Sequence, residues 1–386
     1  MAKTALAALG TSIFSEMTRL AALKGAVNLS QGFPDFEGPA AIVEAGVAAL
    51  REGHNQYGRS MGVPELVAAI AAHQERCYGL QLDPQSEVCA TAGATEAIAA
   101  AMIGLLDPGE EVVLFEPFYD SYPATAAMAG AVPRVVTLRF PSFALEESAL
   151  RAAITGKTRM IVVNTPHNPT GKVFSVAELD MIAGVCIEHD LIALTDEVYE
   201  HITYGAPHIP LATRPGMRER TVTVSSTGKT FSFTGWKVGW ASGPRELIAA
   251  VQRAHQFLTF AAATPLHTAM AHALTTYAQP FFHELACAYR ERRDFLVEVL
   301  REVGFEVSVP QGAYFALASI RALTDEDDVT FAKRLIDEAG VAAIPPSAFY
   351  SCDLQEGRRL LRFAFCKQPA TLELAAVRLR AWRATM

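Results

Sequence analysis

Two lysines stand eight residues apart, Lys229 and Lys237, in the stretch SSTGKTFSFTGWKVGW (residues 225–240). Their neighbours are small, hydroxylic and aromatic, and no acidic residue lies within the stretch. A lysine in an apolar setting without a carboxylate has a lowered pKa, and its neutral amine can form a Schiff base with a carbonyl compound. Most lone lysines are simply solvated, but this setting makes Lys229 a candidate nucleophile.

Known phosphate-binding sequences do not explain this stretch. A P-loop reads G-x-x-x-x-G-K-[ST], which requires a glycine where the chain has Thr223. The segment TAGATEA (91–97) contains no G-x-G-x-x-G dinucleotide motif. It does lead from a strand into a helix near Thr95, and a helix start with free N–H groups suits a phosphate, although Thr95 fits equally well as an ordinary helix cap.

Polar and aromatic side chains follow five predicted strands where each strand ends. The stretches are 92–95 (AGAT), 116–119 (EPFY), 165–169 (TPHNP), 196–199 (DEVY) and 225–229 (SSTGK). Ligands of open α/β sheets bind outside the carboxyl ends of the strands. The five stretches are therefore predicted to form one pocket, in which His167 is expected to be structural.

A metal site is the competing interpretation of TDEVYEH (195–201), where Glu197, Glu200 and His201 lie close together. Hard metal ions usually recruit several carboxylates, and the sequence shows no second cluster of ligands. No metal is therefore expected. Asp196 ends a buried strand and needs a cationic or hydrogen-bonding partner.

The elements that carry these residues indicate an α/β fold. Apolar strand candidates alternate with amphipathic helices in the middle of the chain, which is typical of a mostly parallel sheet covered on both faces. The strands are expected at 87–91, 111–115, 134–138, 160–164, 191–196 and 221–226, and the helices at 95–106, 145–155 and 176–189. Residues 204–217 are rich in glycine and proline and are expected to form a surface loop.

The C-terminal part is predicted to be α+β. Helices are expected at 244–257, 262–278, 281–303, 329–339 and 370–384, and strands at 305–309, 313–317 and 360–365. A chain of 386 residues is too long for one small core. Two domains, or one large and one small, are therefore expected.

Composition narrows the class of protein. The net charge of −8 argues against broad nucleic-acid binding, which needs a basic surface. The six cysteines form no C-x-x-C pair and are expected to be reduced. The apolar run near residues 5–10 is too short for a signal-peptide core, and no run approaches the roughly 18 residues of a membrane span. A cytoplasmic protein without membrane contacts is expected.

One cofactor uses a lysine, an acidic partner, a phosphate cradle and an aromatic platform together, namely pyridoxal phosphate. The chain resembles the pyridoxal-phosphate aminotransferases of fold type I, class I/II, over essentially its whole length, and within them the methionine-preferring and kynurenine/glutamine enzymes. The resemblance rests on nine motifs in order: NLSQGFPDF (28–36), NQYGRSMG (55–62), TAGATEA (91–97), EPFYDSY (116–122), NTPHNPTGKVF (164–174), TDEVYEH (195–201), SSTGKTFSFTGWKVGW (225–240), GVAAIPPSAFYS (340–351) and LLRFAFCK (360–367). It implies a large cofactor-binding domain at 40–280 with a seven-stranded sheet, and a smaller domain formed by 1–39 and 281–386.

The resemblance also implies roles around the cofactor. Lys229 would bind it covalently and move the substrate proton, Asp196 would pair with the ring nitrogen, and Tyr199 and Asn168 would hydrogen-bond its phenolic oxygen. Tyr119 and Val198 would cover the two ring faces. The phosphate would be bound by Gly93, Ala94, Thr95, Ser226 and Lys237, and by Tyr57 from the other subunit of a homodimer. Many relatives have arginine in place of Lys237, so this chain keeps the charge but loses the two-pronged contact.

The substrate would be held at the other side of the pocket. Arg362 lies in the apolar run 360–363, where an unpaired charge is costly, and it would clamp the α-carboxylate with help from Gly32 and Asn168. The resemblance places Phe14, Tyr57 and, from the partner subunit, Phe260 along the side-chain pocket, which favours aromatic or thioether substrates.

The expected function is the transfer of an amino group from such an L-amino acid to a 2-oxo acid. The alternative with the same cofactor is a cysteine-S-conjugate β-lyase. A transcription regulator with an aminotransferase-like sensor domain would need an added basic winged-helix domain, and the residues before position 28 leave no room for one.

Overall fold

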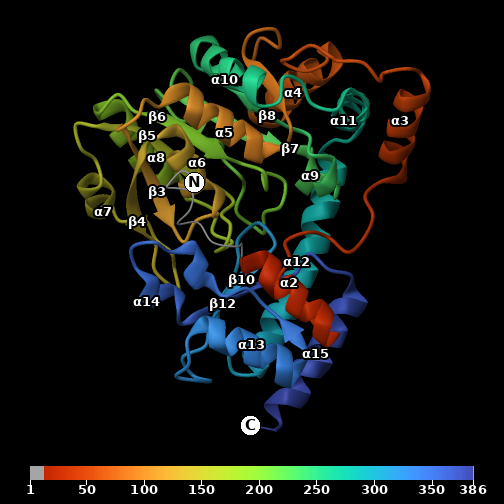
Figure 1. The fold of residues 1–386 in the computed structure, drawn as a ribbon, viewed down its shortest axis with the longest axis vertical. Helices are drawn as coiled ribbons and strands as arrows, with labels where there is room; N and C mark the ends of the chain where they lie inside the picture. Colours follow the sequence, from red (N-terminus) through yellow and green to blue (C-terminus); the bar gives the residue numbers. More distant parts are fainter. Residues whose placement is uncertain (1–12, 386) are drawn as a thin grey trace, which may run out of the picture.

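The structure is a computed structural model, and it describes residues 13–385. The fold is built around a seven-stranded sheet (Figure 1). The strand order is β2 (Val88–Thr91), β8 (Gly239–Ser242), β7 (Thr221–Ser226), β6 (Ile192–Asp196), β5 (Thr158–Asn164), β3 (Glu111–Glu116) and β4 (Val132–Thr137). Only β8 runs antiparallel to its neighbours. The α/β fold with a mostly parallel seven-stranded sheet is therefore confirmed.

Helices cover both faces of this sheet because its central strands are apolar on both sides. Val112 and Leu114 of β3 pack with α5 (Ala94–Leu105), α6 (Ser121–Ala129) and α10 (Arg245–Leu258). The alternate residues Val113 and Phe115 pack on the opposite face with α7 (Glu147–Ala152) and α8 (Val176–Glu188). A third core joins the β2–β8 edge to α3 (Ala40–Arg51), α4 (Pro64–Tyr78) and α11 (Thr264–Thr276).

The C-terminal part forms its own core, seen in blue in Figure 1. Its antiparallel sheet has the order β12 (Leu360–Ala364), β10 (Phe315–Ser319) and β9 (Glu306–Ser308). Its helices are α2 (Ile13–Lys24), α12 (Gln279–Glu302), α13 (Asp328–Ala339), α14 (Leu354–Gly357) and α15 (Pro369–Arg383), and β1 (Val27–Asn28) pairs in parallel with β11 (Val341–Ala342). The N-terminal segment from α2 to β1 thus packs with residues some 300 positions away in the chain, as the predicted domain division requires. The exact domain bounds stay a prediction, and residues 1–12 of the expected small domain lie outside the described part.

The predicted strands and helices lie within a few residues of observed ones, and four differences stand out. Strand β8 (GWAS) was missed because it is short and lacks a Val/Ile run. Helices α2, α3, α4 and α6 were also missed. The expected helix 145–155 shrinks to α7. Residues 204–217 do form a loop, but Leu211 and Met217 are fully buried against α8 and the sheet, so this loop is not wholly on the surface.

No helix within residues 13–385 combines the length and the apolar character needed to cross a membrane.

Candidate active site

A cavity of about 260 Å³ lies at the carboxyl ends of β5, β6 and β7, facing the start of α5. It brings together fourteen of the sixteen predicted site residues: Phe14, Gly32, Gly93, Ala94, Thr95, Tyr119, Asn168, Asp196, Val198, Tyr199, Ser226, Lys229, Lys237 and Arg362. The remaining lining residues are Gln31, Ile98, Tyr122, Asn164, Gly228, Thr234, Val238 and Phe315. The strand-end stretches singled out in the sequence therefore do meet in one pocket.

Lys229 lies in the short helix α9 (Thr227–Thr230), directly after β7, where the strand delivers its side chain into the cavity. Its Nζ lies 5.8 Å from the ring centres of both Tyr199 and Tyr314. Burial lowers the pKa of this amine from 10.5 to about 8, and the nearby charges of Lys237 and Arg362 add to the effect. This direction agrees with the lowered pKa predicted from the apolar sequence, and it favours the neutral amine near pH 8.

Capture of pyridoxal phosphate by the cofactor-free chain is expected to accelerate as the pH rises through about 8 and then to level off. Only the neutral amine attacks an aldehyde, and lowering its pKa moves the neutral form to lower pH. An ordinary lysine would keep accelerating to above pH 10. The rate is measured from the absorbance of the bound cofactor after mixing, and a rate that rises steadily up to pH 10 would contradict the lowered pKa.

Asp196 ends β6 and is held by three neighbouring groups. The Tyr122 hydroxyl donates to Oδ2 at 2.7 Å, and the Val198 backbone N–H approaches Oδ1 at 3.4 Å. Asn164 donates to the Asp196 carbonyl oxygen at 2.8 Å, which fixes the strand end. Burial raises the pKa of the Asp196 carboxyl to about 6. A cation placed beside it would restore its full charge.

The chain makes close approaches at the end of the cavity where α5 begins. A Cβ on Gly239 would lie 2.7 Å from the Ala94 nitrogen, and a Cβ on Gly93 would lie 3.2 Å from the Lys237 Nζ. Gly93 also has a φ of 78°, which favours glycine. Within residues 13–385, Lys237 pairs with no carboxylate. A cation, the start of a twelve-residue helix and the hydroxyl of Ser226 thus line a site suited to an anion.

Arg362 stands opposite, on β12, and is almost fully buried. Its guanidinium donates to Asn168 Oδ1 at 3.1 Å and to the Ser30 carbonyl at 2.9 Å, while Nε is buried without a partner. The ring of Phe315 lies 4.1 Å from Cζ. Burial lowers the pKa of Arg362 to about 10, and no carboxylate in the described part of the chain forms an ion pair with it. A buried guanidinium with a free N–H is a strong binding group for an anion.

These residues fit pyridoxal phosphate. The anion site at α5 suits its phosphate, Asp196 suits a protonated ring nitrogen, and Lys229 suits its aldehyde. Arg362, with its unpartnered buried Nε, stays available for the substrate. The donor set therefore matches the chemical groups of the cofactor one for one.

Tyr57 and Phe260 do not line this cavity in the single chain. Their rings contact each other edge to face at 5.3 Å on the surface, where Tyr57 is 85% exposed and Phe260 48%. Their predicted contribution depends on a second subunit and stays a prediction.

Tyr122, Gln31 and Phe315 are cavity residues that the sequence analysis did not single out. Tyr122 stands three residues after Tyr119 in EPFYDSY, at the start of α6, and this local spacing did not indicate that its hydroxyl reaches Asp196. Gln31 and Phe315 reach the cavity through long-range packing of the C-terminal part, which no local pattern reveals. His167 is buried and lies 2.8 Å from Thr170 Oγ1, which supports its structural role.

Comparison with known proteins shows the family. Residues 24–379 match the family described as aminotransferase class I and II. The chain is 47% identical over 383 residues to a probable N-succinyldiaminopimelate aminotransferase of Mycobacterium tuberculosis (96% of this chain, 95% of the relative). It is 41% identical to the methionine aminotransferase of Escherichia coli, over 96% of each chain. It is 39% identical to kynurenine–oxoglutarate transaminase 3 of mouse, over 97% of this chain and 88% of the relative.

The solved structures agree. The N-succinyldiaminopimelate aminotransferase from Mycobacterium tuberculosis superimposes with a TM-score of 0.95 at 46% identity, over 99% of this chain and 100% of that one. A methionine aminotransferase from Escherichia coli superimposes with a TM-score of 0.94 at 40% identity, over 99% of each chain. The methionine and kynurenine enzymes were expected from the sequence, whereas the N-succinyldiaminopimelate enzyme was not. The chain belongs to the class I and II aminotransferases, and its cofactor is pyridoxal phosphate.

Proposed function

We propose that this aminotransferase takes its amino group from L-amino acids with an uncharged aromatic or thioether side chain, such as phenylalanine, methionine or kynurenine. The supporting observation is the charge of the cavity. Its lining contains three cations among the described residues, Lys229, Lys237 and Arg362. Each has a task in handling the cofactor or the α-carboxylate, so none is left for an acidic side chain.

Two apolar rings line the cavity beside Arg362 and are proposed to contact the substrate side chain as well. Phe14 and Phe315 lie within 5.1 Å of the Arg362 guanidinium carbon, measured to their ring centres. Gln31 donates its amide to the Phe14 carbonyl at 3.2 Å, which holds this wall in place. Aromatic and thioether groups pack favourably against such rings.

The bound cofactor supplies an electron sink that stabilises a carbanion at the substrate Cα. In the proposed roles, Lys229 holds the cofactor and then carries the proton removed from Cα. Asp196, oriented by Tyr122, keeps the cofactor ring positively charged. Tyr199 and Asn168 hydrogen-bond the ring oxygen, and Tyr119 and Val198 pack on the ring faces.

The remaining residues are proposed to bind the two anionic groups, the cofactor phosphate and the substrate α-carboxylate. The phosphate is held by Gly93, Ala94, Thr95, Ser226 and Lys237. Arg362 grips the substrate α-carboxylate in two-pronged fashion, with Asn168 and the Gly32 backbone beside it. Asn168 is already hydrogen-bonded to Arg362, so the two side chains are held in position to bind the same α-carboxylate.

A panel of amino donors tests the substrate proposal. Methionine and phenylalanine are expected to exceed aspartate and glutamate in kcat/KM by about 100-fold or more, because a buried unpaired carboxylate costs several kcal/mol. N-succinyldiaminopimelate carries additional carboxylates and is expected to be a poor substrate. If it is instead the preferred one, the proposed side-chain class is wrong while the aminotransferase assignment stands.

Release of pyruvate from cysteine conjugates without an oxo acid would indicate the β-lyase alternative. The relatives described above carry transaminase names, which favours amino transfer. The donor panel includes this control, with oxo-acid-dependent product expected to dominate.

We also propose a homodimer. Large apolar side chains are exposed at the end of α10 and just after it, with Phe257 at 86%, Leu258 at 48% and Phe260, which contacts Tyr57, at 48%. Such exposure is typical of an interaction surface. The proposed location is the cytoplasm, which the six free cysteines favour.

Sedimentation is expected to give the mass of two chains. Tyr57→Phe is expected to weaken cofactor binding by about 10–100-fold, because the hydroxyl of the partner subunit's Tyr57 would be lost as a hydrogen bond to a charged phosphate. A monomeric enzyme with full activity would contradict both the dimer and the role of Tyr57.

A further inference from the structure

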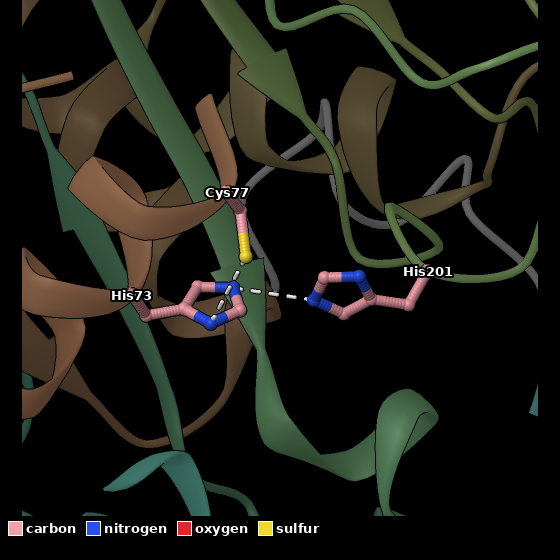
Figure 2. A group of neighbouring side chains, drawn as sticks. All are labelled: His73, Cys77 and His201. Carbon is pink, nitrogen blue, oxygen red and sulfur yellow. Dashed lines mark hydrogen bonds between the residues drawn. The ribbon is translucent and has the colours of Figure 1, made fainter. Parts of the chain in front are cut away.

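A second cluster of ligand-type side chains lies outside the active site, behind the loop that follows β6. His73 and Cys77 are one turn apart on α4, and Figure 2 shows His73 pointing toward His201 and Cys77 pointing toward the His73 ring. The two imidazole Nε2 atoms, of His73 and His201, are 3.2 Å apart. This contact could not be predicted from the sequence, because His73 and His201 stand 128 positions apart.

The carboxylate of Glu200 lies close to both of these Nε2 atoms. Its Oε2 lies 3.5 Å from the Nε2 of His73 and 3.9 Å from the Nε2 of His201. In a tetrahedral zinc site with Zn–N bonds of 2.0–2.1 Å, two ligand atoms are about 3.3 Å apart. The triangle of two nitrogens and one oxygen is close to that size, so one ion can contact all three after small side-chain shifts.

Neighbouring groups orient these atoms. Binding of an ion at His73 Nε2 requires the imidazole proton on Nδ1, where Cys77 Sγ, 3.7 Å away, can accept the hydrogen bond from Nδ1–H. The Arg76 guanidinium lies on this Nδ1 side, 3.4 Å away, and donates to the Leu274 carbonyl. The positive charge of Arg76 therefore lies on the Nδ1 side of the His73 ring, and the two Nε2 atoms meet on the other side.

Further contacts hold Glu200 and His201. Glu200 accepts from Tyr78 at 2.7 Å and, through its other oxygen, from Ser225 at 2.6 Å. The ring of Phe282 stacks on His201 with a centroid distance of 3.7 Å. Outer contacts of this kind fix ligand orientation in metal sites. The side chains of His73, Glu200 and His201 are all largely buried, so the three ligand atoms lie in a site shielded from solvent.

We propose that His73, His201 and Glu200 bind one divalent transition-metal ion such as Zn²⁺, with Cys77 orienting His73. Two imidazole nitrogens select this class of ion over Mg²⁺ or Ca²⁺, which prefer oxygen ligands. The ion ties α4 to the loop that follows Asp196 and carries Tyr199. Its role is structural, behind the cofactor pocket, and the proposal revises the expectation from sequence that no metal is bound.

The test uses the purified holoenzyme, freed of unbound cofactor because pyridoxal phosphate itself binds metal ions. Wild-type enzyme, His73→Gln and His201→Gln are each equilibrated with Zn²⁺, dialysed, and analysed for bound metal. The matched control is His283→Gln, since His283 and Cys287 form the same i, i+4 pair at 3.5 Å on exposed α12. Wild type and the control are expected to retain one Zn²⁺ per chain, and the two cluster variants none. Mg²⁺ is expected to be retained by none of the four.

A second measurement needs no variant. Co²⁺ in the wild-type site is expected to show the intense visible absorption of a four-coordinate ion, and Zn²⁺ is expected to raise the melting temperature of wild type. Retention of Zn²⁺ by His201→Gln equal to wild type, or absence of both Zn²⁺ and Co²⁺ binding by wild type, would overturn the proposal. In either case the cluster would be a hydrogen-bonded network alone.

Discussion

Lys229→Ala is expected to abolish turnover and to remove the visible absorbance of the covalently bound cofactor. General acid–base catalysis alone contributes about 10²–10⁴-fold, and this variant also loses the covalent attachment, so a loss of at least about 10⁴-fold is expected. The change in kcat and the absorbance spectrum are measured on the same sample. Because the lysine is buried and carries a lowered pKa, its removal relieves a desolvation cost, and the chain is expected to fold normally.

Lys157→Ala is the control, since this lysine is exposed in the loop before β5. It is expected to match wild type in both measurements. A Lys229→Ala enzyme that kept the bound absorbance and its turnover would refute the assignment of the covalent lysine. Lys237→Ala separates the two amines, because it is expected to weaken cofactor binding while the absorbance returns at high cofactor concentration.

Lys229 could be predicted as the candidate nucleophile from sequence because its signal is local. An amine in a carboxylate-free apolar stretch at the end of a strand has few explanations, and the structure places Lys229 in that setting, buried beside Tyr199 and Tyr314. Asp196 followed from the same reasoning, since a carboxylate ending a buried strand requires a partner. Ligands of parallel sheets bind at the carboxyl ends of the strands, so both residues were predicted to share one cavity, and both line it.

What the sequence could not supply is pairing over long distances. Strand β8 is recognisable only through its hydrogen bonds to β2 and β7, because its four residues lack a strand-like pattern. Tyr122 became meaningful once its hydroxyl was found 2.7 Å from Asp196, 74 positions away. The histidine cluster is the strongest case, because its helix and its loop meet only in the folded chain. These are tertiary contacts, and local spacing carries no information about them.

The two lysines of the opening stretch also separate in the structure. Lys229 is surrounded by rings and has its neutral form stabilised by burial. Lys237, in a left-handed backbone conformation with a φ of 53°, places its Nζ near Gly93 at the start of α5. The absence of acidic partners thus has two causes: one amine must become neutral, and the other is available for an anion.

Arg362→Met is expected to lower kcat/KM for amino acids by about 10²–10⁴-fold. Two charge-assisted hydrogen bonds to the α-carboxylate contribute about 1.5–3 kcal/mol each, and about 1.4 kcal/mol corresponds to tenfold in rate. Arg362→Lys keeps the charge but cannot make a two-pronged contact, so an intermediate loss is expected. Methionine fills a similar volume between Phe14 and Phe315, so the melting temperature of the variant is expected to stay near that of wild type or to rise.

The decisive control for Arg362 is a donor without a carboxylate. A simple amine such as phenylethylamine is expected to be a poor donor for wild type, and its rate is expected to change little in Arg362→Met, because it has no carboxylate to lose contact with. Equal losses for phenylalanine and phenylethylamine would show that Arg362 acts by organising Asn168 and Ser30, to which it is hydrogen-bonded, rather than by gripping the substrate. The ratio of the two losses therefore isolates the carboxylate contact from any general disturbance of the site.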